Sequence, residues 1–140
     1  MIDRVAKGAA ELRDAVEQFS HLSQRALLAC TQHDELALDA ALNDRDLLSK
    51  RVALLAQQLT GARRVALTPR ARAAIDAVLR PVHVAAQRAA RLNHELSECA
   101  ERARNDVGAQ LDRLRHDDAA LSAYAAAAPR SDESRLDLTR

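Results

Sequence analysis

The stretch LTGARRVALTP, Leu59–Pro69, decides how the chain is divided, because it carries both a helix stop and a helix start. Gly61 accepts the left-handed conformation with which many helices end. Thr68 followed by Pro69 has the form of a cap and a first helical residue, since that position needs no amide hydrogen. We therefore predict a helix that ends near residue 59, a connecting loop over residues 60–68 and a new helix from Pro69.

Before this boundary, apolar residues recur at alternating spacings of three and four, which is typical of a helix packed along a seam. They fall into two groups that differ in phase by about one residue. Thr31-Gln-His-Asp34 between them has the form of a capping box. The sequence thus predicts helices over about 3–31 and 34–59, with one bent helix over 3–59 as the alternative. The two groups are Ile2, Val5, Ala9, Leu12, Val16, Phe19 and Ala26, with Ser23 at the step that lacks an apolar residue, and then Leu38, Ala41, Leu48, Val52, Leu55 and Leu59.

After the boundary, one apolar stripe continues to Ala103, and we predict a third helix over 69–125. Pro81 lies inside it and should kink it, because proline lacks the amide hydrogen and crowds the preceding turn. Beyond Ala103 two successive steps of four form a stutter, which locally unwinds a supercoil. The stripe is Ile75, Val78, Val82, Ala85, Ala89, Leu92, Leu96, Cys99 and Ala103, followed by Val107, Leu111, Leu114 and Leu121.

The composition supports an all-α fold with a thin core. Hydrophobic residues make up 48% of the 140 residues, but 31 residues are alanine, which contributes little apolar area, and only two are aromatic. Good helix formers dominate. We predict an elongated antiparallel helical bundle or coiled coil of three helices, the third very long, over residues 1–125. Residues 126–140 have the composition of a disordered tail.

Helix lengths then predict an open surface near the C-terminal end. The third helix would be about 85 Å long and each of the others about half that, so that its last part would lack a neighbour in the same chain. Exposed apolar rows of this kind mark interaction sites. With the tail leucines included, the candidate partner-binding residues are Val107, Leu111, Leu114, Leu121, Tyr124, Leu136 and Leu138.

Several function classes find little support in the sequence. The basic middle of the chain lacks interleaved aromatics, which disfavours nucleic acid. Neither a membrane span nor a secretory signal is recognisable, so we expect a cytoplasmic chain with reduced Cys30 and Cys99. A zinc site at Cys30, His33, His94 and Cys99 is disfavoured by the ligand spacing. The sequence contains neither a glycine-rich phosphate loop nor a Glu-x-x-His pair, and no catalytic triad can be argued from it. We therefore expect that the protein binds no cofactor or metal and is not an enzyme.

The chain resembles the FlgN-type flagellar export chaperones along nearly its whole length. The resemblance rests on a helical segment, LLACTQHDELALDAALNDRDLLSKRVALLAQQL, on the Asn-x-x-Leu step of RLNHEL, and on the ending AY…SRLDLTR. FliT-type filament-cap chaperones are the second family it resembles. One departure is Ala125, where the first family commonly has glycine after its tyrosine.

This resemblance implies a cytoplasmic chaperone of type III flagellar export. Its clients would be hook–filament junction proteins, also called hook-associated proteins, bound through the long C-terminal helix and the tail. By the same resemblance, Tyr124 would contribute to docking on a component of the membrane export gate. The chaperone itself would not insert into the membrane, and it would be a monomer or weak dimer.

Two other functions fit the same residues. The chain could be a structural coiled-coil scaffold or dimerisation protein without a dedicated client, especially if residues 3–59 form one helix and the resulting hairpin pairs along its seam. A helical metal or thiol protein that uses Cys30 and Cys99 is the third possibility.

Overall fold

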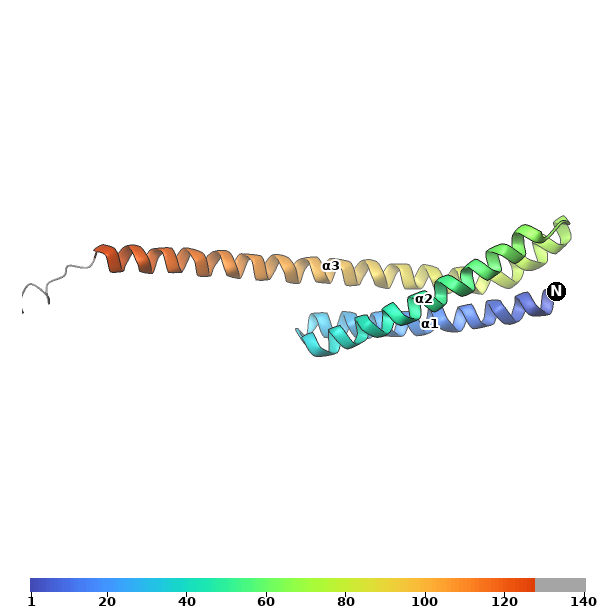
Figure 1. The fold of residues 1–140 in the computed structure, drawn as a ribbon, viewed down its shortest axis with the longest axis horizontal. Coiled ribbons are helices and arrows are strands. Elements are labelled where there is room, and N and C mark those ends of the chain that lie inside the picture. The colour runs from blue at the N-terminus through green and yellow to red at the C-terminus, as the bar shows by residue number, and fades with distance from the viewer. Residues whose placement is uncertain (128–140) are drawn as a thin grey trace, which may run out of the picture. The chain divides into compact units, whose positions relative to one another are not determined.

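The computed structural model describes residues 1–127 and shows an all-α chain, which confirms the predicted fold class (Figure 1). Three helices follow one another, α1 (Ile2–Thr31), α2 (Glu35–Val65) and α3 (Pro69–Ala127). Within residues 1–127 there is no strand. The chain divides into a first unit, Met1–Glu101, and a second unit that begins at Arg102 inside α3. The expected tail lies almost entirely outside the described residues.

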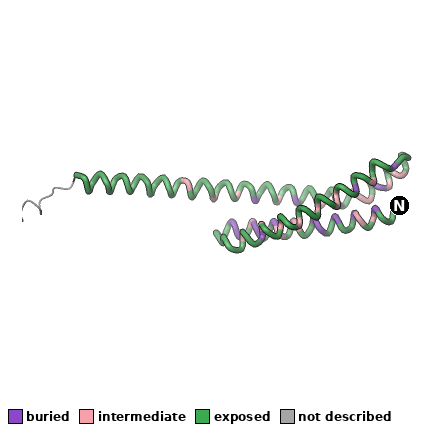
Figure 2. The backbone as a smooth tube through the Cα atoms, in the orientation of Figure 1, coloured by how far each residue is buried: buried purple, intermediate pink, exposed green. Residues whose placement is uncertain are grey.

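In the first unit, all three helices pack around two apolar clusters, visible as the buried positions in Figure 2. The predicted stripes supply every buried member of these clusters except Cys30 and Ala66, because spacings of three and four place side chains on one face of each helix. The larger cluster joins the start of α1, the end of α2 and the start of α3. The smaller joins the end of α1, the start of α2 and α3 near Leu96. Their buried members are Val5, Ala9, Leu12, Val16, Leu59, Ala66, Ile75, Val82 and Ala89, and then Ala26, Cys30, Ala41 and Leu96.

A polar layer, formed by Ser20, Ser23, Arg45 and Asn93, lies between the two clusters along the helices. The Arg45 guanidinium donates to Asn93 Oδ1 on α3 at 2.7 Å and lies 4.7 Å from the centre of the Phe19 ring on α1. Ser23 is fully buried and donates to the carbonyl oxygen of Phe19 at 2.9 Å. One α2 side chain therefore connects all three helices.

Burial of Arg45 has both favourable and unfavourable effects on the free energy of folding. Desolvation lowers the pKa of its guanidinium, and the neighbouring Asp46 carboxylate partly opposes that shift. Arg45 Nε and Ser20 Oγ are both buried without a hydrogen-bond partner. A buried polar atom without a hydrogen-bond partner destabilises the fold, because the cost of removing it from water is not compensated. The layer thus gains from its cation–π contact and its bond to Asn93, and loses part of that gain to desolvation.

The predicted break after Thr31 is confirmed, and it excludes a single helix over 3–59. His33 adopts a positive φ of 55°, and the Asp34 amide donates to the carbonyl oxygen of Ala29 at 2.9 Å while the His33 amide donates to that of Cys30 at 3.3 Å. This pair of bonds is a Schellman motif, which ends a helix at a left-handed residue. The predicted capping residue is wrong, because Asp34 and not Thr31 caps α2, accepting from the Ala37 amide at 3.1 Å. Thr31 instead donates to the carbonyl oxygen of Leu28.

The predicted helix stop at Gly61 is wrong, because α2 continues to Val65. The reason is that the apolar spacing continues past the glycine. Leu59 and Ala66 are buried in the larger cluster, and Ala62 packs against it. This packing outweighs the loss of helix propensity at one glycine, which is about 1 kcal/mol. The connection between α2 and α3 is therefore residues 66–68 and not 60–68.

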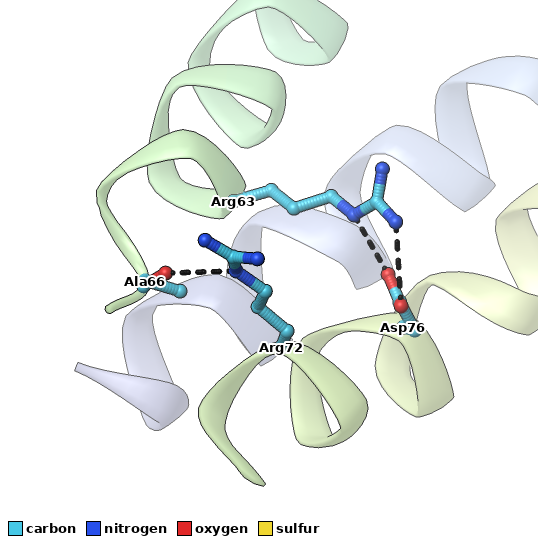
Figure 3. Close-up of polar contacts among 4 residues, drawn as sticks. All are labelled: Arg63, Ala66, Arg72 and Asp76. Carbon is cyan, nitrogen blue, oxygen red and sulfur yellow. Dashed lines mark hydrogen bonds and ion pairs between the residues drawn. The ribbon is translucent and has the colours of Figure 1, made fainter. Parts of the chain in front are cut away.

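Side chains from both helices hold this short connection, as Figure 3 shows. Arg63 near the end of α2 forms two contacts with the Asp76 carboxylate, of 2.9 Å and 3.4 Å, and Arg72 Nε donates to the carbonyl oxygen of Ala66 at 3.0 Å. Thr68 Oγ1 accepts from the Ala71 amide at 3.2 Å, so the predicted cap before Pro69 is confirmed. The contacts fix the direction in which α3 starts.

Candidate functional site

The candidate site is an apolar row on the second unit, which we call the C-terminal stripe and define as Val107, Leu111, Leu114, Leu121 and Tyr124. All five side chains are exposed, from 48% for Leu111 to 78% for Tyr124. Figure 2 shows residues 109–127 as exposed throughout. The predicted exposure of these residues is confirmed, whereas their role in binding a partner stays a prediction.

Helix geometry places the stripe on one side of the helix. At about 100° per residue, Val107, Leu111, Leu114 and Leu121 fall within an arc of roughly 80°. Tyr124 lies about 60° beyond Leu121, at the edge of this face, so that all five side chains fall within an arc of about 140°. The stripe is therefore an apolar row about five turns long, of the kind that pairs with another amphipathic helix.

Asp118 interrupts the stripe at its centre. It lies four residues after Leu114 and three before Leu121, and is exposed. An acidic side chain at such a position loses hydration when a partner covers it, and it then requires a basic or hydrogen-bonding group opposite. Asp118 therefore disfavours any partner that presents a carboxylate at the same level, including a second copy of this helix aligned in parallel.

Charged residues of both signs border the stripe. Arg104 and Arg115 lie on one side, and Asp106, Arg113 and Asp117 lie on the other; all five are exposed. Flanking charges of this kind select partners and orientation more than they add affinity. The face is thus apolar along its axis and charged at its edges.

The two remaining predicted partner-binding residues, Leu136 and Leu138, lie outside the residues that the structure describes. The stripe as defined here contains the other five.

The four side chains considered for zinc are only partly brought together. Cys30 and Cys99 are in contact, with 2.8 Å between their Sγ atoms, while His94 contacts Glu98 at 3.3 Å and His33 occupies the turn after α1. Within residues 1–127, no group of three or more His, Cys, Asp or Glu side chains is arranged to hold a metal ion.

Sequence reasoning missed a second exposed apolar surface, which lies on α2 in the first unit. Leu36, Leu47 and Leu54 are 85%, 69% and 56% exposed. Leu47 also lines an open groove of about 520 Å³ between α1 and α2, bordered by Leu22, Leu48, Arg25 and Arg51. Their spacing of eleven and seven residues places the three exposed leucines on one helix face. This spacing was visible in the sequence, but the three leucines do not belong to the apolar stripe predicted for this helix.

In residues 1–127, no helix combines the length and the continuous apolar character needed to cross a lipid bilayer. Comparison of the chain with protein-family models, with curated proteins and with solved structures finds no match in any of the three.

Proposed function

We propose that this protein is a cytoplasmic chaperone of type III flagellar export, which acts by binding a client and catalyses no reaction. The observation that carries the proposal is the C-terminal stripe, whose five apolar side chains are 48–78% exposed on one helix face. The resemblance to FlgN-type chaperones supplies the class of client, a hook–filament junction protein. The stripe supplies the place where the client would bind.

Binding would follow helix-in-groove recognition, in which an amphipathic client helix lays its apolar face along the stripe. Covering the stripe side chains would contribute roughly 1.5–3 kcal/mol for each one that becomes fully buried. The cost of association and of ordering the client offsets much of this sum. A moderate affinity results, which suits a factor that must release its cargo at an export gate.

The stripe also indicates what the client helix should carry. A basic residue opposite Asp118 would compensate for the desolvation of the carboxylate. Charged residues at the edges of the client helix would then set its direction by pairing with Arg115 on one side or Asp117 on the other. A client without any such basic residue would bind less tightly.

The direct test is a binding measurement with a purified hook–filament junction protein. The full chain should bind it, and the triple variant Leu111→Ser/Leu114→Ser/Leu121→Ser should bind at least tenfold more weakly with an unchanged circular dichroism melting curve. The matched control is Leu36→Ser/Leu47→Ser/Leu54→Ser, which removes the same number of exposed leucines from α2. The control should bind like the native chain. Equal binding by the native chain and the stripe variant would show that the client does not use this site.

Deletion of residues 106–140 extends the test to the whole C-terminal region. The clusters and the polar layer involve only residues before 102, so the shortened chain should retain its fold and lose client capture. Retained capture would place the client site elsewhere on the chain.

A structural scaffold that pairs through the stripe is the competing function. Sedimentation equilibrium separates the two functions, because a scaffold would form a tight dimer that the stripe variant dissociates, whereas a chaperone would be a monomer or weak dimer. Asp118→Leu sharpens the measurement. It completes the apolar row, and we expect it to increase self-association of a chain that is otherwise monomeric.

A further inference from the structure

Cys30 and Cys99 are the two cysteines of the chain, and the fold brings them together from positions 69 residues apart. Cys30 lies in the last turn of α1 and Cys99 lies in α3. The Cys99 thiol donates to Cys30 Sγ at 2.8 Å. Both residues are thiols in this structure. A disulfide bond has a sulfur–sulfur length of about 2.05 Å, so the two sulfurs are within 1 Å of bonding distance.

Packing holds both cysteines in place. Cys30 is 6% exposed within the smaller cluster, beside Ala26, Ala41 and Leu96. Its carbonyl oxygen accepts a bond from the His33 amide in the Schellman motif, which fixes its backbone. Leu96, one helical turn before Cys99, is buried in the same cluster, and Cys99 packs against that cluster. The packing of the core therefore restrains both side chains and brings their sulfur atoms into contact.

The two thiols differ in access. Cys30 is buried, whereas Cys99 is only partly buried. A small oxidant therefore reaches Cys99 first, and Cys30 is the thiol positioned to react next. This is the arrangement of a reacting and a resolving cysteine.

We propose that Cys30 and Cys99 form an oxidation site that a hydroperoxide such as hydrogen peroxide converts to an intramolecular disulfide. The Cys99 thiolate attacks one peroxide oxygen, the O–O bond breaks, and a sulfenic acid and hydroxide result. Cys30 then attacks the sulfenic sulfur, the S–S bond forms, and the departing oxygen leaves as water. In sum, two thiols and one hydrogen peroxide give one disulfide and two waters. A dithiol reductant returns the two electrons and reverses the bond.

The bond would tie the C-terminal end of α1 to α3 inside the first unit. A crosslink between distant residues stabilises a fold mainly by restricting the unfolded chain, and more so for a longer loop. We expect oxidation to raise the melting temperature by about 5–15 °C for a chain of this size. This inference concerns the bundle and does not depend on the proposed client.

The test treats the purified full chain with a slight excess of hydrogen peroxide under anaerobic conditions. We expect both thiols to be lost together by thiol titration in denaturant. The intact mass should fall by about two hydrogen masses, a peptide map should link the Cys30 and Cys99 peptides, and the melting temperature should rise and return with dithiothreitol. The Cys99→Ala variant should give no link and no rise. Cys30→Ala serves the same purpose should that variant fail to fold.

Three outcomes would overturn the proposal. The first is a linked dimer of two chains in place of an internal link. The second is oxidation of Cys99 to the sulfinic acid while Cys30 stays available to alkylation. The third is an internal link that leaves the melting temperature unchanged or lowers it.

Discussion

Residues 69–101 and residues 102–127 belong to the same helix, and both carry an apolar row at helical spacing, but the rows have opposite environments. In the first segment, Ile75, Val82, Ala89 and Leu96 are buried, and the residues of the row between them are half-buried. In the second, Val107, Leu111, Leu114 and Leu121 are exposed. The same pattern is thus a core in one place and an open surface in the other. Periodicity identifies the face of a helix, and only the presence of neighbouring helices decides whether that face is covered.

The substitution Leu96→Ala should have the largest effect on stability. Leu96 is 6% exposed in the smaller cluster, and truncating a buried leucine leaves a cavity as well as losing apolar burial. We expect a loss of about 2–5 kcal/mol in the free energy of unfolding, measured by urea denaturation followed by circular dichroism. A loss below about 1 kcal/mol would mean that the covered segment is not packed as the structure indicates.

Arg45→Ala should have the next largest effect, because it removes a side chain that contacts both other helices of the first unit. The bond to Asn93 and the contact with the Phe19 ring are both lost. Relief from desolvation offsets part of the loss, so we expect a cost of about 1–2 kcal/mol. A double-mutant cycle with Asn93→Ala isolates the hydrogen bond. Its coupling energy should be clearly above zero, and independent effects of the two substitutions would contradict the proposed layer.

Replacing one glycine in each unit by alanine should have a smaller effect on stability than the two substitutions above. Gly61 and Gly108 both lie inside helices, and an added Cβ at either would meet no atom within 4 Å. Alanine should therefore stabilise the local helix by up to about 1 kcal/mol in both. Gly61→Ala should raise the melting midpoint of the bundle. Gly108→Ala should leave that midpoint unchanged and slow amide exchange in residues 102–127 instead. Equal rises in the midpoint would mean that both units unfold as one.

Leu114→Ala should have the smallest effect, although it is the same substitution in the same helix as Leu96→Ala. Leu114 is 64% exposed, so its truncation should change the free energy of unfolding by less than about 0.5 kcal/mol. Denaturation at two protein concentrations checks this. A large loss that grows with protein concentration would show that a second copy of the chain covers the stripe.

Much of the fold was predictable from the sequence, because it depends on local periodicity. The α3 stripe from Ile75 to Ala103 is buried or half-buried at every predicted position. On α1, however, the predicted seam residue Ile2 is 51% exposed, since it lies in the first turn. The exposure of the C-terminal stripe followed from helix length alone.

One error arose where long-range packing outweighed a local preference, and the other concerned local backbone conformation. Gly61 favours a helix end, but burial of Ala66 and the Arg63–Asp76 ion pair extend α2 beyond it. His33 takes a left-handed conformation that glycine or asparagine would have signalled. The contact between Cys30 and Cys99 could not be predicted, because it depends on how α1 and α3 align. The exposure of an apolar surface likewise does not identify the partner that binds there.

The polar layer also restricts how the helices of the first unit can slide along one another. Alanine-rich apolar faces are alike from turn to turn, so a shift of α2 by one turn, about 5.4 Å, would preserve much of the apolar contact. The same shift would carry the Arg45 guanidinium away from Asn93 and towards an apolar cluster, where its charge would have no acceptor. The hydrogen bond between Arg45 and Asn93 therefore selects a single register for the helices of an otherwise repetitive bundle.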